Sequence, residues 1–152
     1  GVNLQASTCV ELAQHPNIVA VKEASGNLQQ IMEILRDKPA DFDVLSGDDS
    51  ITQPMMALGA KGVISVAANG YPDLFCKMVK SMMNVDVKTS LDIHYKTLKM
   101  NNLIFADGNP AGIKCLMAHQ NLCKNVLRLP LVTVNENVKN DLINEFNVMY
   151  NK

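Results

Sequence analysis

Residues 18–27 read Ile18-Val19-Ala20-Val21-Lys22-Glu23-Ala24-Ser25-Gly26-Asn27, and this stretch decides the fold. Four apolar residues lead into a lysine, and small and polar turn residues then open onto a helical pattern. The order predicts a buried strand over 18–22, an abrupt exit, and a helix over about 27–37. A charged amine at the carboxyl end of a buried parallel strand lies where α/β proteins place their chemistry.

Two further strand–helix units follow the first. The segment 42–46 predicts a second strand, which leaves through Gly47-Asp48-Asp49-Ser50 into a short helix beginning close to Thr52. A third strand is expected over 62–66, and Pro72 opens the helix that follows it. Three such units in sequence predict a parallel sheet with right-handed crossovers.

The rest of the chain is predicted to be helical. Residues 1–16 carry a weak apolar stripe, and helices are expected over about 86–100, 110–121 and 136–150. No low-complexity segment or flexible linker interrupts the sequence, so the residue pattern shows no internal domain boundary.

The composition excludes several classes of function. The 152 residues are 47% hydrophobic and carry a net charge of −1, which gives no basis for binding nucleic acid or an anionic membrane. No apolar run approaches the roughly 20 residues of a membrane span, and no signal peptide is visible, so a soluble protein is expected. The four scattered cysteines predict free thiols in a reducing cytoplasm.

Lys22 is the first candidate catalytic residue, and two interpretations of it are open. Strand alternation places Lys22 on one face with Ile18 and Ala20, and Glu23 on the opposite face. A lysine at a strand end can simply extend its ammonium group into water. Alternatively, a barrel interior would disfavour the charged amine and free it to attack a ketone as a Schiff-base nucleophile.

The turn Ser46-Gly47-Asp48-Asp49 is a second constellation. Paired aspartates suit metal or acid–base chemistry, but they suit the start of a helix better, because their carboxylates accept hydrogen bonds from unpaired N–H groups there. Gly47 would let the backbone approach a ligand closely.

The remaining histidines and cysteines give weaker patterns. Cys115, His119 and Cys123 follow one another at helical spacing, but no fourth ligand stands at a fixed spacing, so ordinary packing is expected and no metal is predicted. His15 and His94 stand alone and are expected at the surface or at helix caps.

Several motifs occur in a fixed order along the chain. They are Val21-Lys22-Glu23-Ala24-Ser25-Gly26-Asn27, Leu45-Ser46-Gly47-Asp48-Asp49 and Gly62-Val63-Ile64-Ser65-Val66, followed by Phe105, Asn109-Pro110, Lys114 and Leu127-Arg128-Leu129-Pro130. Together they resemble the dihydrodipicolinate synthase family of lysine-dependent class I aldolases, which is related to N-acetylneuraminate lyase. The intervals of 25 residues from Lys22 to Gly47 and of 17 residues from Gly47 to Ile64 match that family as well. The residues of the first two motifs favour the synthase branch over the lyase branch.

The resemblance covers nearly the whole chain but only the second half of the family's protein. It implies an α/β fold: the C-terminal half of a TIM (β/α)8 barrel, with about three parallel strands and their helices, followed by a C-terminal helical region. The expected organisation is a partial barrel over 1–84 and a helical region over 85–152 that packs on it. The first five strands, the family's proton relay and its carboxylate-binding arginine belong to the other half.

The resemblance also implies a reaction. Lys22 would form an imine with pyruvate, and the backbone at Gly47 and Ile64 would line the pyruvate pocket. The resulting enamine would condense with aspartate semialdehyde in lysine and diaminopimelate biosynthesis, with no metal or organic cofactor required. Asp107-Gly108 and Ala111-Gly112 depart from the family's pattern, in a loop that does not involve the lysine.

Other outcomes stay open. One is the related N-acetylneuraminate lyase reaction, and another is a catalytically incomplete fragment that self-associates. Two open sheet edges and an apolar face demand a partner, either the N-terminal half of the barrel or further copies in a homo-oligomer, so the chain is not expected to be a stable monomer. The residues expected on that face are Ile18, Ala20, Val44, Ile64 and Val66.

Overall fold

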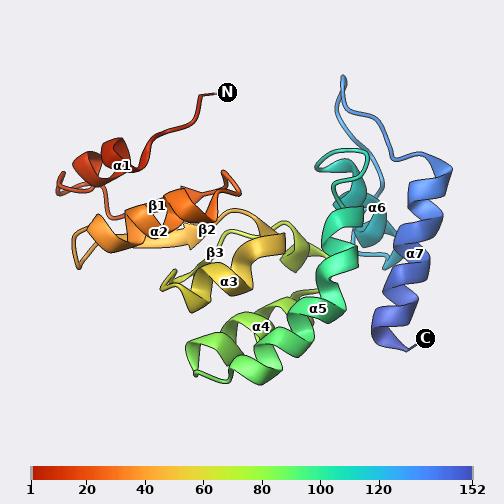
Figure 1. The fold of residues 1–152 in the computed structure, drawn as a ribbon. Coiled ribbons are helices and arrows are strands. Elements are labelled where there is room, and N and C mark those ends of the chain that lie inside the picture. Colours follow the sequence, from red (N-terminus) through yellow and green to blue (C-terminus); the bar gives the residue numbers. More distant parts are fainter. Residues whose placement is uncertain (1, 152) are drawn as a thin grey trace.

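The computed structural model describes residues 2–151 and contains a three-stranded parallel sheet (Figure 1). Its strands are β1 (Ala20–Glu23), β2 (Asp43–Ser46) and β3 (Gly62–Val63), and they lie side by side in that order. Helix α2 (Leu28–Asp37) connects β1 to β2. The sequence correctly predicted three parallel strands, each followed by helical structure.

The register of the sheet fixes which side chains share a face. Lys22 of β1 pairs with Leu45 of β2, and Leu45 pairs with Gly62 of β3. Paired residues of parallel strands point to the same side, so these three positions form one layer. Val21 and Val44 form the preceding layer on the opposite side, which the helices cover.

Short helices complete the crossovers and precede the sheet. The segments η1 (Asp49–Ile51) and α3 (Thr52–Ala57) carry the chain from β2 towards β3, and η2 (Ala67–Asn69) follows β3. Helix α1 (Ala6–Leu12) precedes β1 and packs against α2. Asn27 caps α2, because its side chain accepts a hydrogen bond from the N–H of Gln30.

Four longer helices make up the rest of the molecule. Helices α4 (Pro72–Met83) and α5 (Val87–Leu103) pack against each other, and Figure 1 places them between the sheet and the remaining two helices. Helix α6 (Ala111–His119) and helix α7 (Glu136–Tyr150) pack together at the far end.

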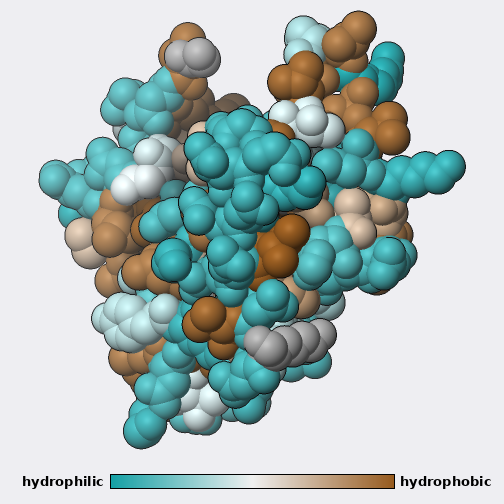
Figure 2. All heavy atoms as spheres, turned by 90° about the vertical axis from the view of Figure 1, so that its right-hand side faces the viewer, coloured by the Kyte–Doolittle hydropathy of each residue, from teal (hydrophilic) through white to brown (hydrophobic). Residues whose placement is uncertain are grey.

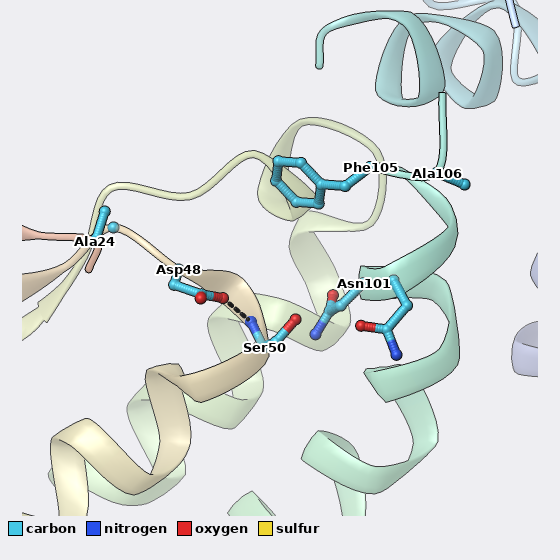
Figure 3. A pocket seen from close by; sticks show the side chains of 8 residues that line it. Ala24, Asp48, Ser50, Asn101, Phe105 and Ala106 are labelled. Carbon is cyan, nitrogen blue, oxygen red and sulfur yellow. Dashed lines mark hydrogen bonds between the residues drawn. The ribbon is translucent and has the colours of Figure 1, made fainter. Parts of the chain in front are cut away.

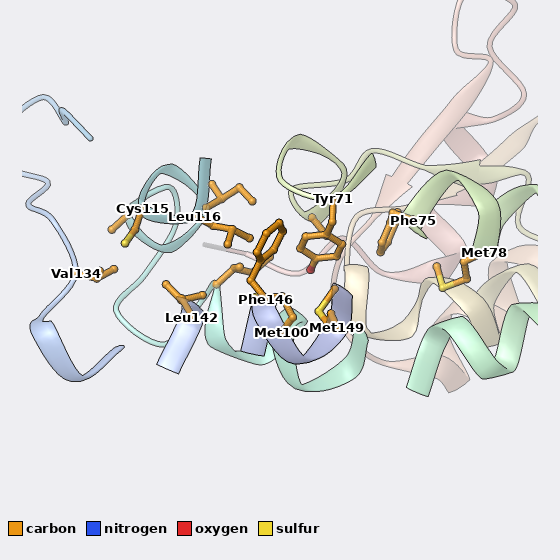
Figure 4. Close-up of a cluster of buried hydrophobic side chains, with 14 of the residues drawn as sticks. Tyr71, Phe75, Met78, Met100, Cys115, Leu116, Val134, Leu142, Phe146 and Met149 are labelled. Carbon is orange, nitrogen blue, oxygen red and sulfur yellow. The ribbon is translucent and has the colours of Figure 1, made fainter. Parts of the chain in front are cut away.

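Two apolar cores hold these elements. The smaller core lies between the sheet, α1, α2 and α3. The larger core joins η2 and α4 to α5, α6 and α7, with Tyr71 and Phe146 among its buried aromatic residues (Figure 4). Because η2 and α4 directly follow β3, the larger core fixes the exit of that strand to the helical region. The buried residues of the smaller core are Cys9, Ile31, Ile34, Val44, Met55 and Ala60.

Most predicted boundaries are close to those observed, and the largest differences are at the ends of elements. The strand expected over 62–66 ends after Val63, because the N–H groups of Val66 and Ala67 bond to a side chain instead of a neighbouring strand. The helix expected over 1–16 spans only Ala6–Leu12, since turns occupy the residues before Pro16.

The open face of the sheet is less apolar than the sequence analysis expected. Val44 is fully buried under the helices, and Val66 packs against the larger core, so the assignment of both to the open face was wrong. Val44 pairs with Val21, and this register places it on the covered side. Ile64 is 50% exposed, as expected for the open side.

The molecular surface is mostly hydrophilic on the side formed by the helical region (Figure 2). Apolar atoms are visible on the projections at the top of this view. The segment between α6 and α7 contributes strongly exposed apolar side chains, among them Val126, Leu129 and Val132. Among residues 2–151, no helix combines the length and apolar character that crossing a membrane requires.

Candidate active site

The structure brings Lys22 and Gly47 into direct contact. A Cβ atom on residue 47 would lie 2.8 Å from Lys22 Cε and 2.8 Å from the Ala24 Cβ atom, which is closer than side chains approach one another. The side chain of Lys22 therefore occupies the space that any residue other than glycine would fill. The two positions that the family resemblance linked are therefore in contact.

Ile64 lies in the same layer as Gly47. The N–H of Gly47 donates to the carbonyl of Glu23 at 2.7 Å, and the N–H of Ile64 donates to the carbonyl of Ser46 at 2.8 Å. These bonds continue the parallel ladder one step beyond the strands, so Ala24, Gly47 and Ile64 lie side by side. By alternation this layer is on the Lys22 face, at the carboxyl ends of the strands.

Lys22 is exposed, whereas the sequence analysis expected it at the end of a buried strand. The reason is topological: among residues 2–151, no strand pairs with the outer edge of β1. A barrel interior is closed by all of its strands, and three of them leave the Lys22 face open to solvent. The amine is in the expected position without the expected enclosure.

Glu23 points to the opposite face, as predicted, and is buried. Its carboxyl group accepts hydrogen bonds from the N–H of Ser25 at 2.6 Å and from Gln30 Nε2 at 3.1 Å. These bonds fix the exit turn directly after Lys22. Burial, and secondly the charge of Glu23, raise the pKa of the nearby Cys9 thiol, which disfavours the reactive thiolate form.

A hollow opens beside Gly47 and is bounded by the end of α5 (Figure 3). Its volume is about 420 Å³, which falls within the range of about 300–1,000 Å³ that small-molecule sites occupy. In Figure 3 the ring of Phe105 faces Ala24 across this space. Lys22 lines the adjoining hollow along β1, and Ala24 borders both. The lining residues are Ala24, Gly47, Asp48, Ser50, Asn101, Asn102, Phe105 and Ala106.

The two aspartates of the exit turn have different partners. Asp48 Oδ1 accepts a hydrogen bond from the N–H of Ser50 at 2.9 Å, which confirms the expected capping role at the start of η1. Asp49 is buried, and its Oδ2 atom accepts hydrogen bonds from the N–H groups of Val66 and Ala67, which lie in a later segment of the chain. The spacing of the two residues gave no indication of this long-range contact.

The other titratable side chains form no comparable site. Helix α6 ends at His119, so Cys123 lies beyond it, and within residues 2–151 no group of three or more Cys, His, Asp or Glu residues could hold a metal ion. His94 is buried in α5, which contradicts the expectation of a surface or capping position. Burial lowers the pKa of His94, which disfavours its charged form.

Asn101 and Asn102 are site-lining residues that the sequence analysis missed. They lie in the last turns of α5, more than fifty positions after Gly47, and no motif marks them. Their place beside the strand exits depends on how α5 packs against η1 and α4.

Comparisons with known proteins agree with this geometry. A sequence profile of the Dihydrodipicolinate synthetase family matches residues 1–147. The chain is 49% identical over 133 residues to the 4-hydroxy-tetrahydrodipicolinate synthase of Phocaeicola vulgatus, and 47% identical over 133 residues to that of Parabacteroides distasonis. Each match covers 87% of this chain and 45% of the relative, so the chain spans about half the length of the curated relatives it matches.

Solved structures show the same relation. The dihydrodipicolinate synthase of Thermotoga maritima superposes with a TM-score of 0.96 at 28% identity, covering 99% of this chain and 52% of that one. The chloride-inhibited enzyme of Acinetobacter baumannii, complexed with pyruvate, superposes with a TM-score of 0.94 at 30% identity, covering 99% and 52%.

The fold is therefore the C-terminal half of a TIM (β/α)8 barrel with a helical region after it, and the candidate site lies at the carboxyl ends of its strands. This is the place at which such barrels carry their active sites. The chain belongs to the dihydrodipicolinate synthetase family.

The bond between Gln30 and Glu23 yields a prediction for stability. Replacing Gln30 with Ala leaves the buried carboxyl group with one partner fewer, so we expect the free energy of unfolding to fall by about 1–3 kcal/mol. Lost contacts of Gln30 with Asn3 and Leu4 add to this effect. Urea unfolding followed by circular dichroism measures the change.

The neighbouring glutamine provides the control. Gln29 is exposed, and the substitution Gln29→Ala should change the free energy of unfolding by no more than about 0.5 kcal/mol. Equal losses in the two variants would show that the Glu23 bond does not stabilise the exit turn.

Proposed function

We propose that this chain is the lysine-bearing half of a pyruvate-dependent class I aldolase, in which Lys22 forms a Schiff base with pyruvate. The observation that carries the proposal is the position of the Lys22 side chain over Gly47, in register with Ile64, at the carboxyl ends of three parallel strands. The family relationship, and the relative that was solved with pyruvate, support the choice of substrate.

The proposed chemistry needs no metal or organic cofactor, because the lysine itself supplies the electron sink. The groups that take up and return protons are proposed to come from the amino-terminal half of the barrel. The neutral amine of Lys22 attacks the ketone carbon of pyruvate, and loss of water leaves a protonated imine. Its positive charge acidifies the adjacent methyl group, which loses a proton to give an enamine. The enamine carbon then bonds to the aldehyde carbon of aspartate semialdehyde, whose oxygen takes up a proton. The amino group of the adduct attacks the imine carbon, closes the ring and releases Lys22, giving 4-hydroxy-tetrahydrodipicolinate for lysine and diaminopimelate synthesis.

Gly47 and Ile64 have limited roles in this scheme. Both N–H groups are already donated to carbonyls of the sheet, so neither is free to bind the carboxylate of pyruvate. Their contribution is shape: Gly47 leaves room for the lysine, and Ile64 forms an apolar wall beside it. The donors for the carboxylate must come from elsewhere, and the half of the barrel that relatives possess in addition is the natural source.

The openness of the site also indicates what kind of partner it needs. The exposed Lys22 and the unpaired outer edges of β1 and β3 leave the site unenclosed in residues 2–151. We propose that enclosure comes from the amino-terminal half of the barrel, and that the completed protein forms a homo-oligomer. Without that half, the expected outcome is self-association through the sheet edges and little turnover.

Trapping with pyruvate and borohydride tests the role of Lys22. Borohydride reduces an imine to a stable secondary amine, so we expect one pyruvyl group on the peptide that contains Lys22 and none after the substitution Lys22→Arg. Arginine keeps the positive charge but forms no imine under these conditions. Mass spectrometry of proteolytic peptides locates the adduct.

The control is the exposed Lys61, because Lys61→Arg should leave the adduct on Lys22 unchanged. The measurement is made on the chain alone and on the chain mixed with the unmatched amino-terminal half of the Phocaeicola vulgatus relative. An adduct that survives Lys22→Arg, or its absence from both samples, would refute the Schiff-base role.

The contact between Lys22 and Gly47 provides a second prediction. In a Gly47→Ala variant the new Cβ atom meets Lys22 Cε at 2.8 Å, so the lysine must leave its position. We expect trapping by pyruvate to slow by about tenfold or more, because reacting groups must be held in a near-attack geometry. The trapping rate is measured at fixed pyruvate concentration by intact-protein mass spectrometry.

Gly62 is the matched control for this substitution. It belongs to the Lys22 layer, but a Cβ atom there would meet Leu45 Cδ2 at an ordinary 3.7 Å. Gly62→Ala should therefore trap pyruvate at nearly the wild-type rate. If the two alanine variants trap pyruvate equally fast, the space at Gly47 is not what places the lysine.

A further inference from the structure

We infer that Asp49 is a positioning residue, which holds the exits of β2 and β3 at the separation that places Ile64 beside Gly47 and Lys22. The inference rests on the proposed function for its catalytic consequence. Its structural part depends only on the contacts of Asp49.

The carboxylate of Asp49 joins two exit segments that are distant in sequence. Asp49 is 2% exposed, and its Oδ2 atom accepts hydrogen bonds from the N–H groups of Val66 and Ala67, both at 2.9 Å. Asp49 begins η1 directly after the exit of β2, whereas Val66 and Ala67 lie directly after the exit of β3. Hydrogen bonds to an ionised acceptor are about twice as strong as neutral ones, so this is a firm link.

Few hydrogen bonds tie the exit of β3 to the exit of β2, although the larger core packs against the segment that follows β3. The strand itself spans only two residues, and the bond from Ile64 N–H to the Ser46 carbonyl is the last step of its ladder. The next hydrogen bond that ties this segment to the β2 exit is the one that Val66 donates to Asp49. Ile64 is therefore held between a ladder bond on one side and the Asp49 carboxylate on the other.

The environment of the other carboxylate oxygen indicates that Asp49 positions the strand exit more than it stabilises the fold. Asp49 Oδ1 is buried, and it has no hydrogen-bond partner among the described residues. A buried polar atom without a partner lowers stability, so this carboxylate is an inefficient way to hold a fold together. Its geometry, with one oxygen accepting two neighbouring N–H groups, suits the fixing of a loop.

Two buried side chains hold the backbone of Asp49 in turn. The hydroxyl of Tyr71 donates to Asn101 Oδ1 at 2.6 Å, and Asn101 Nδ2 donates to the carbonyl of Asp49 at 3.4 Å. Tyr71 and Asn101 are both completely buried. Burial, and secondly the charge of Asp49, raise the pKa of Tyr71, which keeps its hydroxyl protonated as a donor.

This arrangement connects the helical region to the site. Tyr71 directly precedes α4, Asn101 belongs to α5, and Asn101 also lines the hollow beside Gly47. Movement of α5 relative to the sheet would therefore reach the strand exits through Asn101 and Asp49. On this account the helical region has its own apolar core and also supports the proposed pyruvate site.

Three variants test the inference by two readouts. Asp49→Ala removes the acceptor, Asp49→Asn keeps an oxygen but loses the charge, and Asp86→Ala removes an exposed cap of α5 that accepts a bond from Thr89 N–H at 3.1 Å. The first readout is hydrogen exchange of the Ile64 amide, measured by NMR. The second is the pyruvate concentration that gives half-maximal borohydride trapping on Lys22.

For Asp49→Ala we expect Ile64 exchange to accelerate by about tenfold or more, and half-maximal trapping to need about tenfold more pyruvate while the maximal rate changes less. Asp49→Asn should give a smaller change in the same direction, and it keeps the test decisive if the alanine variant does not fold. Asp86→Ala should lower the melting temperature without moving either readout.

The inference is overturned if the Ile64 amide exchanges no faster in either Asp49 variant than it does in Asp86→Ala. Absence of any Lys22 adduct in the unsubstituted chain, alone or with the added half, would refute the proposed function instead. The exchange of Ile64 would still decide whether Asp49 positions the strand exit.

Discussion

The hydrogen bond from the Gly47 N–H to the Glu23 carbonyl is the interaction on which the rest of the site depends. It extends the parallel ladder past the last residues of β1 and β2, and it brings the Cα atom of Gly47 against the side chain of Lys22. A parallel register then determines everything in that layer: Ala24 and Ile64 flank Gly47, and the lysine lies one layer below on the same side. Any side chain at residue 47 would conflict with the lysine, so the glycine and the amine are one structural unit.

The opposite face of the same strands carries the support. Glu23 is fixed by Gln30 and by the exit turn, and Val44 packs under the helices, so the backbone that presents Lys22 is anchored from behind. The anchored strand fixes the backbone of Lys22, and its side chain remains exposed. The remaining enclosure has to come from outside these three strands, which agrees with a chain that spans about half of its relatives' length.

Much of the fold was predictable from the sequence because it depends on local patterns. Alternation along 18–22 and the exit turn after it gave β1, the face of Lys22 and the opposite orientation of Glu23. The lengths of elements were less predictable where tertiary contacts override local preference. The third strand stops early because Asp49 takes the N–H groups of Val66 and Ala67, and nothing in the local sequence announces that contact.

The candidate site was predictable to a similar degree. Lys22 was a candidate from its place at a strand end, and the family resemblance implied Gly47 and Ile64 as its neighbours. The structure brings the three residues together in adjoining layers. The residues that were missed belong to α5 and to the buried network behind the site, since their placement follows from helix packing over long sequence separations. The exposure of Lys22 was also unpredictable from local pattern, because it depends on how many strands enclose the site.

The most direct test of the central claim is a crystal structure of the protein after reduction in the presence of pyruvate. The account predicts continuous electron density from Lys22 Nζ to the pyruvyl carbon, on the open side of the sheet, in contact with the Cα atom of Gly47 and beside Ile64. Density for the group on a different lysine, or a modified Lys22 turned away from Gly47, would contradict it.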